Sequence, residues 1–232
     1  MARRPRHSRF WRQHTPYTCG PAALGNFLLL WEPHAPGPSL TEEIHLWRES
    51  SSILCPGSHA ASLALAAAHR GLRPIIYESG RRPFLADHVR RDHPRVDAVT
   101  YLVLDRVLRE DARREGIPTF RGPGPPDVGE DGGAGLLLMD SAHVGHREIA
   151  PHWVGLLTRE GGGTILFDPL RRRALPSSRS LRDWWEVSGY AGSRCWIGLR
   201  PPSRSRPQVV PAGHSSSGNR TGSPSRRWVA SG

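Results

Sequence analysis

Residues 13–24 of this 232-residue chain read QHTPYTCGPAAL, and the fold prediction starts from this stretch. A turn-prone His14-Thr15-Pro16 precedes Cys19, and the Gly-Pro pair after the cysteine opens an apolar run that favours a helix. We therefore expect Cys19 at a helix N-terminus, where unpaired N–H groups and the positive end of the helix dipole stabilise a thiolate. Thiolate is the attacking form of cysteine, so Cys19 is a candidate nucleophile. The alternative is a small apolar residue buried at a helix start.

Gln13 lies six residues before Cys19 and strengthens the first interpretation. Acyl transfer needs hydrogen-bond donors aimed at the developing oxyanion. The side-chain amide of Gln13 and the backbone N–H of Cys19 could supply two such donors. A lone glutamine carries no information, but Gln-x5-Cys-Gly-Pro before a helix is moderately specific.

The candidate base and its partner come from the second half of the chain. His152 begins the apolar run HWVGLLT, and Asp168 ends the run TILFD. Glycines 161–163 separate the two runs and favour a hairpin, which would place the strands side by side. Asp168 could then accept a hydrogen bond from the His152 imidazole and fix its tautomer. The alternatives are a strand that starts with one of 12 histidines by chance, and an Asp-Pro turn.

The elements change character once along the chain. Helices are expected over residues 21–32, 39–49, 58–70, 83–91 and 95–115, with a strand over 72–77. Strands are expected over 135–140, 152–158, 164–168 and 195–199, with a helix around Trp184 and Trp185. This pattern predicts an α+β fold, with a helical N-terminal half packed on an antiparallel β-sheet.

Three local expectations accompany this pattern. The helix over 95–115 should carry an apolar face formed by Val99, Leu102, Val103, Val107 and Leu108. Gly155 interrupts the strand after His152 and should loosen the packing behind the base. The Gly- and Pro-rich segment 121–135 is expected to be a mobile surface loop.

Composition divides the chain into three parts. Residues 1–12 are expected to be a basic flexible arm, 13–200 the folded domain, and 201–232 a disordered tail rich in Pro, Ser and Arg. Eleven arginines in residues 1–12 and 200–232 account for the net charge of +11, so the domain between them is neutral. The chain contains no lysine, and we expect no nucleic-acid partner and no membrane association. Three scattered cysteines do not form a disulfide framework and suit the cytoplasm.

The site residues and their surroundings resemble the papain-like cysteine peptidases that remove double-glycine leader peptides from bacteriocins, and in particular a stand-alone bacterial branch of that family. The resembling segments are 13–24, Leu46-Trp47-Arg48-Glu49, Ala150-Pro151-His152-Trp153-Val154 and Phe167-Asp168-Pro169. The resemblance implies a papain-like fold and a role in peptide maturation, with a peptide or protein as substrate and no cofactor. It also implies Cys19 as nucleophile, His152 as base, Asp168 as its partner and Gln13 as oxyanion donor. It gives no substrate sequence and no oligomeric state.

Other readings use overlapping residues. The same four side chains would serve a transpeptidase or an amide-forming acyltransferase, in which an amine replaces water. A binding module could have kept the fold without activity. Zinc ligands could come from Cys55 and His59 or from His143 and His146, with His152 as a further ligand, but neither pair belongs to a recognisable four-ligand pattern.

Overall fold

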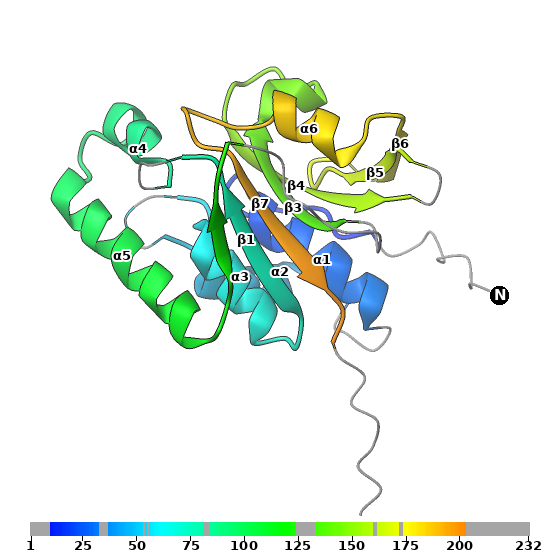
Figure 1. Ribbon diagram of the computed structural model, residues 1–232, viewed down its shortest axis with the longest axis horizontal. Helices are drawn as coiled ribbons and strands as arrows, with labels where there is room; N and C mark the ends of the chain where they lie inside the picture. Colours follow the sequence, from blue (N-terminus) through cyan, green and yellow to red (C-terminus); the bar gives the residue numbers. More distant parts are fainter. Residues whose placement is uncertain are drawn as a thin grey trace, which may run out of the picture. The chain divides into compact units, whose positions relative to one another are not determined.

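The α+β prediction is confirmed by a computed structural model, which describes residues 10–32, 37–52, 54, 56–80, 84–123, 133–159, 162–171 and 174–202 (Figure 1). The helices are α1 (Cys19–Trp31), α2 (Leu40–Ser50), α3 (Ala60–Ala68), α4 (Ala86–Asp92), α5 (Ala98–Arg114) and α6 (Leu181–Val187), with a 3₁₀ turn η1 (Ser141–Val144). The strands are β1 (Arg73–Glu78), β2 (Thr119–Arg121), β3 (Ala134–Asp140), β4 (Pro151–Thr158), β5 (Thr164–Phe167), β6 (Ala174–Ser177) and β7 (Cys195–Arg200). None of the helices in the described ranges is long and apolar enough to span a bilayer.

The strands form one seven-stranded sheet in the order β2-β1-β7-β3-β4-β5-β6. The strand β7 is late in the chain but lies between β1 and β3, antiparallel to both (Figure 1). The short strand β2 was not expected, and it pairs parallel with β1. The expected hairpin is present, because β4 and β5 pair antiparallel from Gly155↔Phe167 to Thr158↔Thr164. This pairing brings the two ends that carry His152 and Asp168 to the same edge of the domain.

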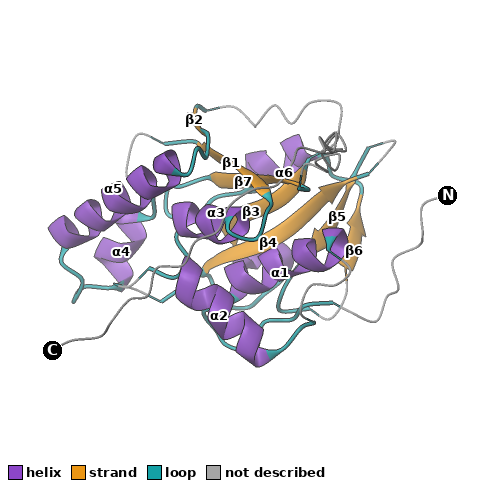
Figure 2. Ribbon diagram, turned by 90° about the horizontal axis from the view of Figure 1, so that it is seen from below, coloured by secondary structure: helices purple, strands orange, loops and turns teal. Residues whose placement is uncertain are grey.

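Helices cover both faces of the sheet (Figures 1 and 2). On one face α1 packs against β3 and β4, α3 packs against β1 and β7, and α2 packs against both of these helices. On the other face α6 contributes Trp184 and Trp185 to a second apolar cluster. Alternate residues of β3 divide between the clusters: Leu136 and Leu138 join the first and Leu137 and Met139 the second. The strand is therefore buried on both sides, which explains its unbroken apolar sequence.

The boundary expected between the arm and the domain lies too late in the sequence. Trp11 is only 2% exposed and belongs to the main core. Its indole lies against α1 at Gly25, where a β-carbon would come within 2.4 Å of the ring. Its backbone N–H also donates to the side-chain oxygen of Asn26 at 2.9 Å. An aromatic residue of this size is well packed, so the folded domain includes residues from at least Phe10 onward.

Gly155 does not loosen the packing behind the base. A β-carbon at this position would lie 3.0 Å from the Phe27 ring and 3.1 Å from the β-carbon of Phe167. Phe27 and Phe167 themselves stack edge to face at 5.7 Å. The glycine therefore allows α1 to approach β4 closely, and this approach carries the start of α1 toward His152.

The apolar face expected on the long helix exists, but most of it faces solvent. Val99, Val103 and Val107 of α5 are each about half or more exposed, and Leu102 is 43% exposed. The buried positions of α5 are Tyr101, Asp105 and Ala112, two of them polar. The segment expected as a loop over 121–135 overlaps β2 and β3 at its ends, and its residues 124–132 lie outside the described ranges.

Candidate functional site

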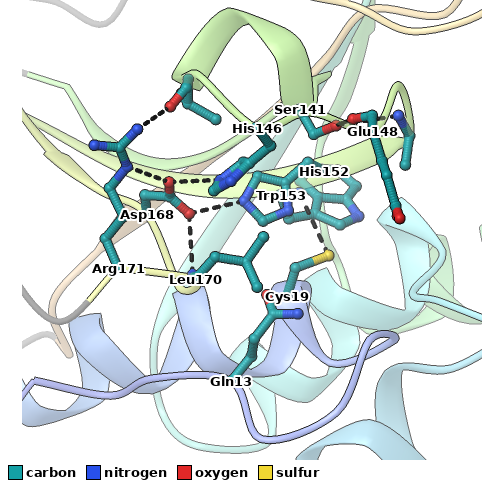
Figure 3. Close-up of polar contacts among 12 residues, drawn as sticks. Gln13, Cys19, Ser141, His146, Glu148, His152, Trp153, Asp168, Leu170 and Arg171 are labelled. Carbon is teal, nitrogen blue, oxygen red and sulfur yellow. Dashed lines mark hydrogen bonds and ion pairs between the residues drawn. The ribbon is translucent and has the colours of Figure 1, made fainter.

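Cys19 is the first residue of α1 and its thiol is buried. The preceding residue, Thr18, makes no side-chain cap on the helix, so the first N–H groups of α1 remain directed at the region around the sulfur. The thiol sulfur accepts a hydrogen bond from the backbone N–H of Trp153 at 3.5 Å. This contact links the start of α1 to β4, the two elements that carry the candidate nucleophile and the candidate base (Figure 3).

His152 occupies the buried start of β4, and its Nε2 donates to Oδ1 of Asp168 at 2.9 Å. This bond leaves Nδ1 as the nitrogen available to the thiol. His152 directly precedes Trp153, whose N–H binds the thiol, and its ring acts on Cys19 electrostatically. The structure therefore brings together the three side chains that the sequence singled out from three separate segments.

The surroundings stabilise the charged forms of the pair. Burial alone would raise the pKa of the Cys19 thiol, but the hydrogen bond and charge of His152 outweigh it, and the pKa is lowered. Burial also disfavours the imidazolium, yet hydrogen bonds to Asp168 and Cys19 raise the pKa of His152 to about 9. Both pKa shifts act in the direction of a thiolate beside an imidazolium.

Gln13 is buried beside the same site, and its backbone N–H donates to the carbonyl of Pro169 at 3.0 Å. Its side-chain Nε2 donates one hydrogen to the carbonyl of Thr15 at 3.0 Å. An amide nitrogen carries two hydrogens, so the second is free for another acceptor. Its Oε1 is buried and has no hydrogen-bond partner among the described residues. The Gln13 amide is thus held near Cys19 and still has hydrogen-bonding capacity to spare.

A buried carboxylate that the sequence analysis missed holds the turn between Gln13 and Cys19. Glu43 of α2 is fully buried and accepts from the backbone N–H of His14 at 2.7 Å. It also accepts from the His14 imidazole and from the hydroxyl of Thr18. The sequence feature that could have identified Glu43 is its position three residues before the core residue Leu46, on the face of α2 that packs inward.

The second oxygen of Asp168 has partners of its own. His146 donates from Nε2 to Oδ2 at 2.9 Å, and the guanidinium of Arg171 lies 3.3 Å from the same oxygen (Figure 3). The sequence analysis considered His146 only as a zinc ligand and did not consider Arg171. Nothing in the sequence reveals this contact, because η1 and the loop after it bring His146 back over the β4–β5 ends.

Two cavities flank the thiol. A narrow one of 430 Å³ is lined mainly by apolar and aromatic side chains, among them Phe84, Leu85 and Trp153, and it includes Cys19. A wider one of 1080 Å³ is more open and polar, and it is lined by Gln13, His146 and His152.

The zinc reading gains little support from the geometry. Cys55 lies outside the described residues. The Nδ1 of His59 accepts from Ala61 and its Nε2 bonds to Asp105, so both nitrogens are engaged. Donor atoms of His146, His152 and Asp168 lie within 4.8 Å of one another, as in a three-ligand metal site. The Arg171 cation beside Asp168, however, opposes a second cation there.

Comparison with known proteins identifies a family. A model described as the Peptidase C39-like family matches residues 8–179, which include Gln13, Cys19, His152 and Asp168. No curated protein matches the chain.

Proposed function

Because the chain belongs to the Peptidase C39-like family and has its papain-like fold, we propose that it is a cysteine peptidase in which Cys19 attacks peptide carbonyls. The observation that carries the proposal is that the Cys19 thiol binds the backbone at the start of β4, beside His152, and that His152 is hydrogen-bonded to Asp168. A buried thiol at a helix N-terminus has no need of a histidine and a carboxylate for packing alone. This set of groups fits nucleophilic catalysis.

In the first step the Cys19 thiolate attacks the scissile carbonyl and forms a tetrahedral intermediate. The backbone N–H of Cys19 and the free hydrogen of the Gln13 amide donate to the oxyanion. The His152 imidazolium then gives its proton to the leaving amine, and an acyl-thioester remains on Cys19. Asp168 accepts from Nε2 throughout, so it holds the imidazole in the tautomer whose Nδ1 faces the sulfur.

In the second step neutral His152 takes a proton from water, and the resulting hydroxide attacks the thioester. The acid product leaves Cys19 as a thiolate, and the proton that His152 took from water restores the imidazolium of the starting state. His152 lies among the residues of the wider cavity, so this cavity suits the leaving amine and the incoming water. The narrow cavity then takes the acyl side of the substrate. The resemblance in residues 13–24 and 150–154 supports a role for the enzyme in peptide maturation.

The decisive experiment is mass spectrometry of a peptide library incubated with the wild type and with Cys19→Ala. We expect the wild type to produce new peptide termini and Cys19→Ala to produce none above background. Cys195→Ala is the matched control, because Cys195 is buried in β7 and burial raises the pKa of its thiol. It should cleave like the wild type. Cleavage by Cys19→Ala at the wild-type rate would disprove the proposal, and addition of a competing amine would reveal any acyl transfer by product mass.

A further inference from the structure

Asp168 is held more completely than a carboxylate that only orients one histidine needs to be. It is fully buried. Its Oδ1 accepts from Nε2 of His152 at 2.9 Å and from the backbone N–H of Leu170 at 3.0 Å. Its Oδ2 accepts from His146 at 2.9 Å and pairs with Arg171 at 3.3 Å. A carboxylate offers about four acceptor positions, and all of them are used here.

His146 differs from the other partners because it also contacts the base itself. Its ring meets the ring of His152 edge to face, with centroids 5.3 Å apart and planes at 79°. The two imidazoles therefore bind opposite oxygens of one carboxylate and pack against each other. Rotation of Asp168 about its side-chain bonds would break both hydrogen bonds together.

The turn that carries His146 is itself fixed. The backbone N–H of His146 donates to the carbonyl oxygen of Ser141 at 3.2 Å. The guanidinium of Arg171 donates to the carbonyl of Val144 while its Nε faces Asp168. Gly145 adopts a left-handed conformation with φ of 80°, which turns the chain back toward β4. His146 is thus presented to Asp168 by a braced turn, and its side chain is partly accessible from the wider cavity.

We propose that His146 is a positioning residue, which locks the Asp168 carboxylate so that His152 stays beside the Cys19 thiol. It acts through Asp168 and through ring contact with His152. The inference rests on the proposed function for its effect on turnover. Its effect on the reactivity of Cys19 can be measured without any peptide substrate.

The test compares His146→Leu, which keeps bulk but loses the donor, with His146→Gln, whose amide nitrogen can reach the position of Nε2. The first readout is the rate constant for alkylation of Cys19 by iodoacetamide at neutral pH, with the adduct mapped by mass spectrometry. We expect His146→Leu to lower this rate about tenfold. Removal of an outer hydrogen-bond partner from a metal-bound imidazole lowers activity by a similar factor. His146→Gln should restore most of it. His143→Gln is the control, because His143 is exposed on the same turn.

A double-mutant cycle separates positioning from simple stabilisation of the turn. In an Asp168→Ala background the His146→Leu change should have little further effect on alkylation, because the carboxylate through which it acts is gone. Where peptide turnover is measurable, His146→Leu should lower kcat and leave KM nearly unchanged. If His146→Leu does not fold, His146→Asn, which is polar but too short to reach Asp168, takes its place.

Equal alkylation rates in the wild type and His146→Leu would overturn the inference. It would also be overturned if His146→Leu lowered the alkylation rate as much in the Asp168→Ala background as in the wild type. Failure of the proposed function looks different: the wild type would cleave no peptide, whereas the dependence of Cys19 alkylation on His146 would remain.

Discussion

At the scale of single residues, the proposed chemistry depends on one thiol and one imidazole that stabilise each other's charged forms. The pKa of Cys19 is lowered and that of His152 is raised to about 9. Neither change follows from burial, which opposes both. Each depends in part on the partner, so the loss of either side chain weakens the pKa shift of the other.

This coupling predicts a bell-shaped pH profile of kcat/KM. Activity should rise as Cys19 ionises, at a pH below that of an ordinary thiol, and should fall near pH 9 as His152 loses the proton that the leaving amine needs. Asp168→Asn removes one cause of the raised pKa of His152, so the alkaline limb should move to lower pH. Steady-state kinetics between about pH 5 and 10 measure both limbs. An alkaline limb that stays in place in Asp168→Asn would contradict the assignment.

The sequence was informative for residues with a chemically distinctive neighbourhood and uninformative for those without one. Cys19, His152 and Asp168 stand at a helix start and at strand ends, where periodicity and turn signals locate them, and Gln13 is located by its spacing from Cys19. The structure brings these four residues together. His146 and Arg171 stand in loops, and their contact with Asp168 depends on how those loops return in space. Glu43 is a charged residue at a core position. Hydrophobic periodicity predicts apolar residues at such positions, so it gives no reason to single out a glutamate there.

At the scale of elements, the turn from Gln13 to Thr18 depends on the carboxylate of α2. We expect Glu43→Leu to leave the backbone N–H of His14 unpaired, at about 1–3 kcal/mol for a buried group, and to leave the Thr18 hydroxyl with only its contacts to Thr15. The free energy of unfolding should fall by that order, and kcat should fall too, because the turn carries Gln13 and leads into Cys19.

Chemical denaturation and steady-state kinetics of the same preparation measure the two effects. Glu42→Gln is the matched control, because its side chain is the partly exposed neighbour on α2. A Glu43→Leu protein with wild-type kcat would show that the turn is held by other contacts.

The contact between α1 and the segment before it gives a second prediction at this scale. Alanine usually stabilises a helix relative to glycine by about 0.5–1 kcal/mol. At Gly25 the new methyl group would come within 2.4 Å of the Trp11 indole. Overpacking of this kind costs about 1–3 kcal/mol, so Gly25→Ala should lower the unfolding midpoint. Gly37→Ala is the control, since its β-carbon would meet nothing within 4 Å. A higher midpoint for Gly25→Ala would contradict the packing described for Trp11.

Periodicity located the helices well but did not reveal which face of α5 is buried. The apolar stripe through Val99, Val103 and Val107 was clear in the sequence, yet these side chains are exposed. The buried side is occupied by Asp105, which pairs with His59 and Arg109. A helix that is docked through polar groups breaks the rule that the apolar face packs inward.

At the scale of the whole molecule, the folded domain and the C-terminal segment should be separable. The last strand ends at Arg200, and residues 203–232 are rich in Ser, Pro, Gly and Arg. A chain ending at Pro202 should keep the wild-type kcat/KM and unfolding midpoint. A chain ending before Cys195 lacks β7 and should not fold. Loss of activity in the first truncation would show that the segment takes part in function.

The position of β7 also determines when the candidate site can be completed during synthesis of the chain. Cys19 leaves the ribosome early and His152 much later, but the strand that joins β1 to β3 is made last of all. A nascent chain therefore exposes two incomplete half-sheets until translation of the domain ends. Pairings between segments so distant in sequence form slowly. The proposed activity should accordingly arise only after β7 has left the ribosome and joined the two half-sheets.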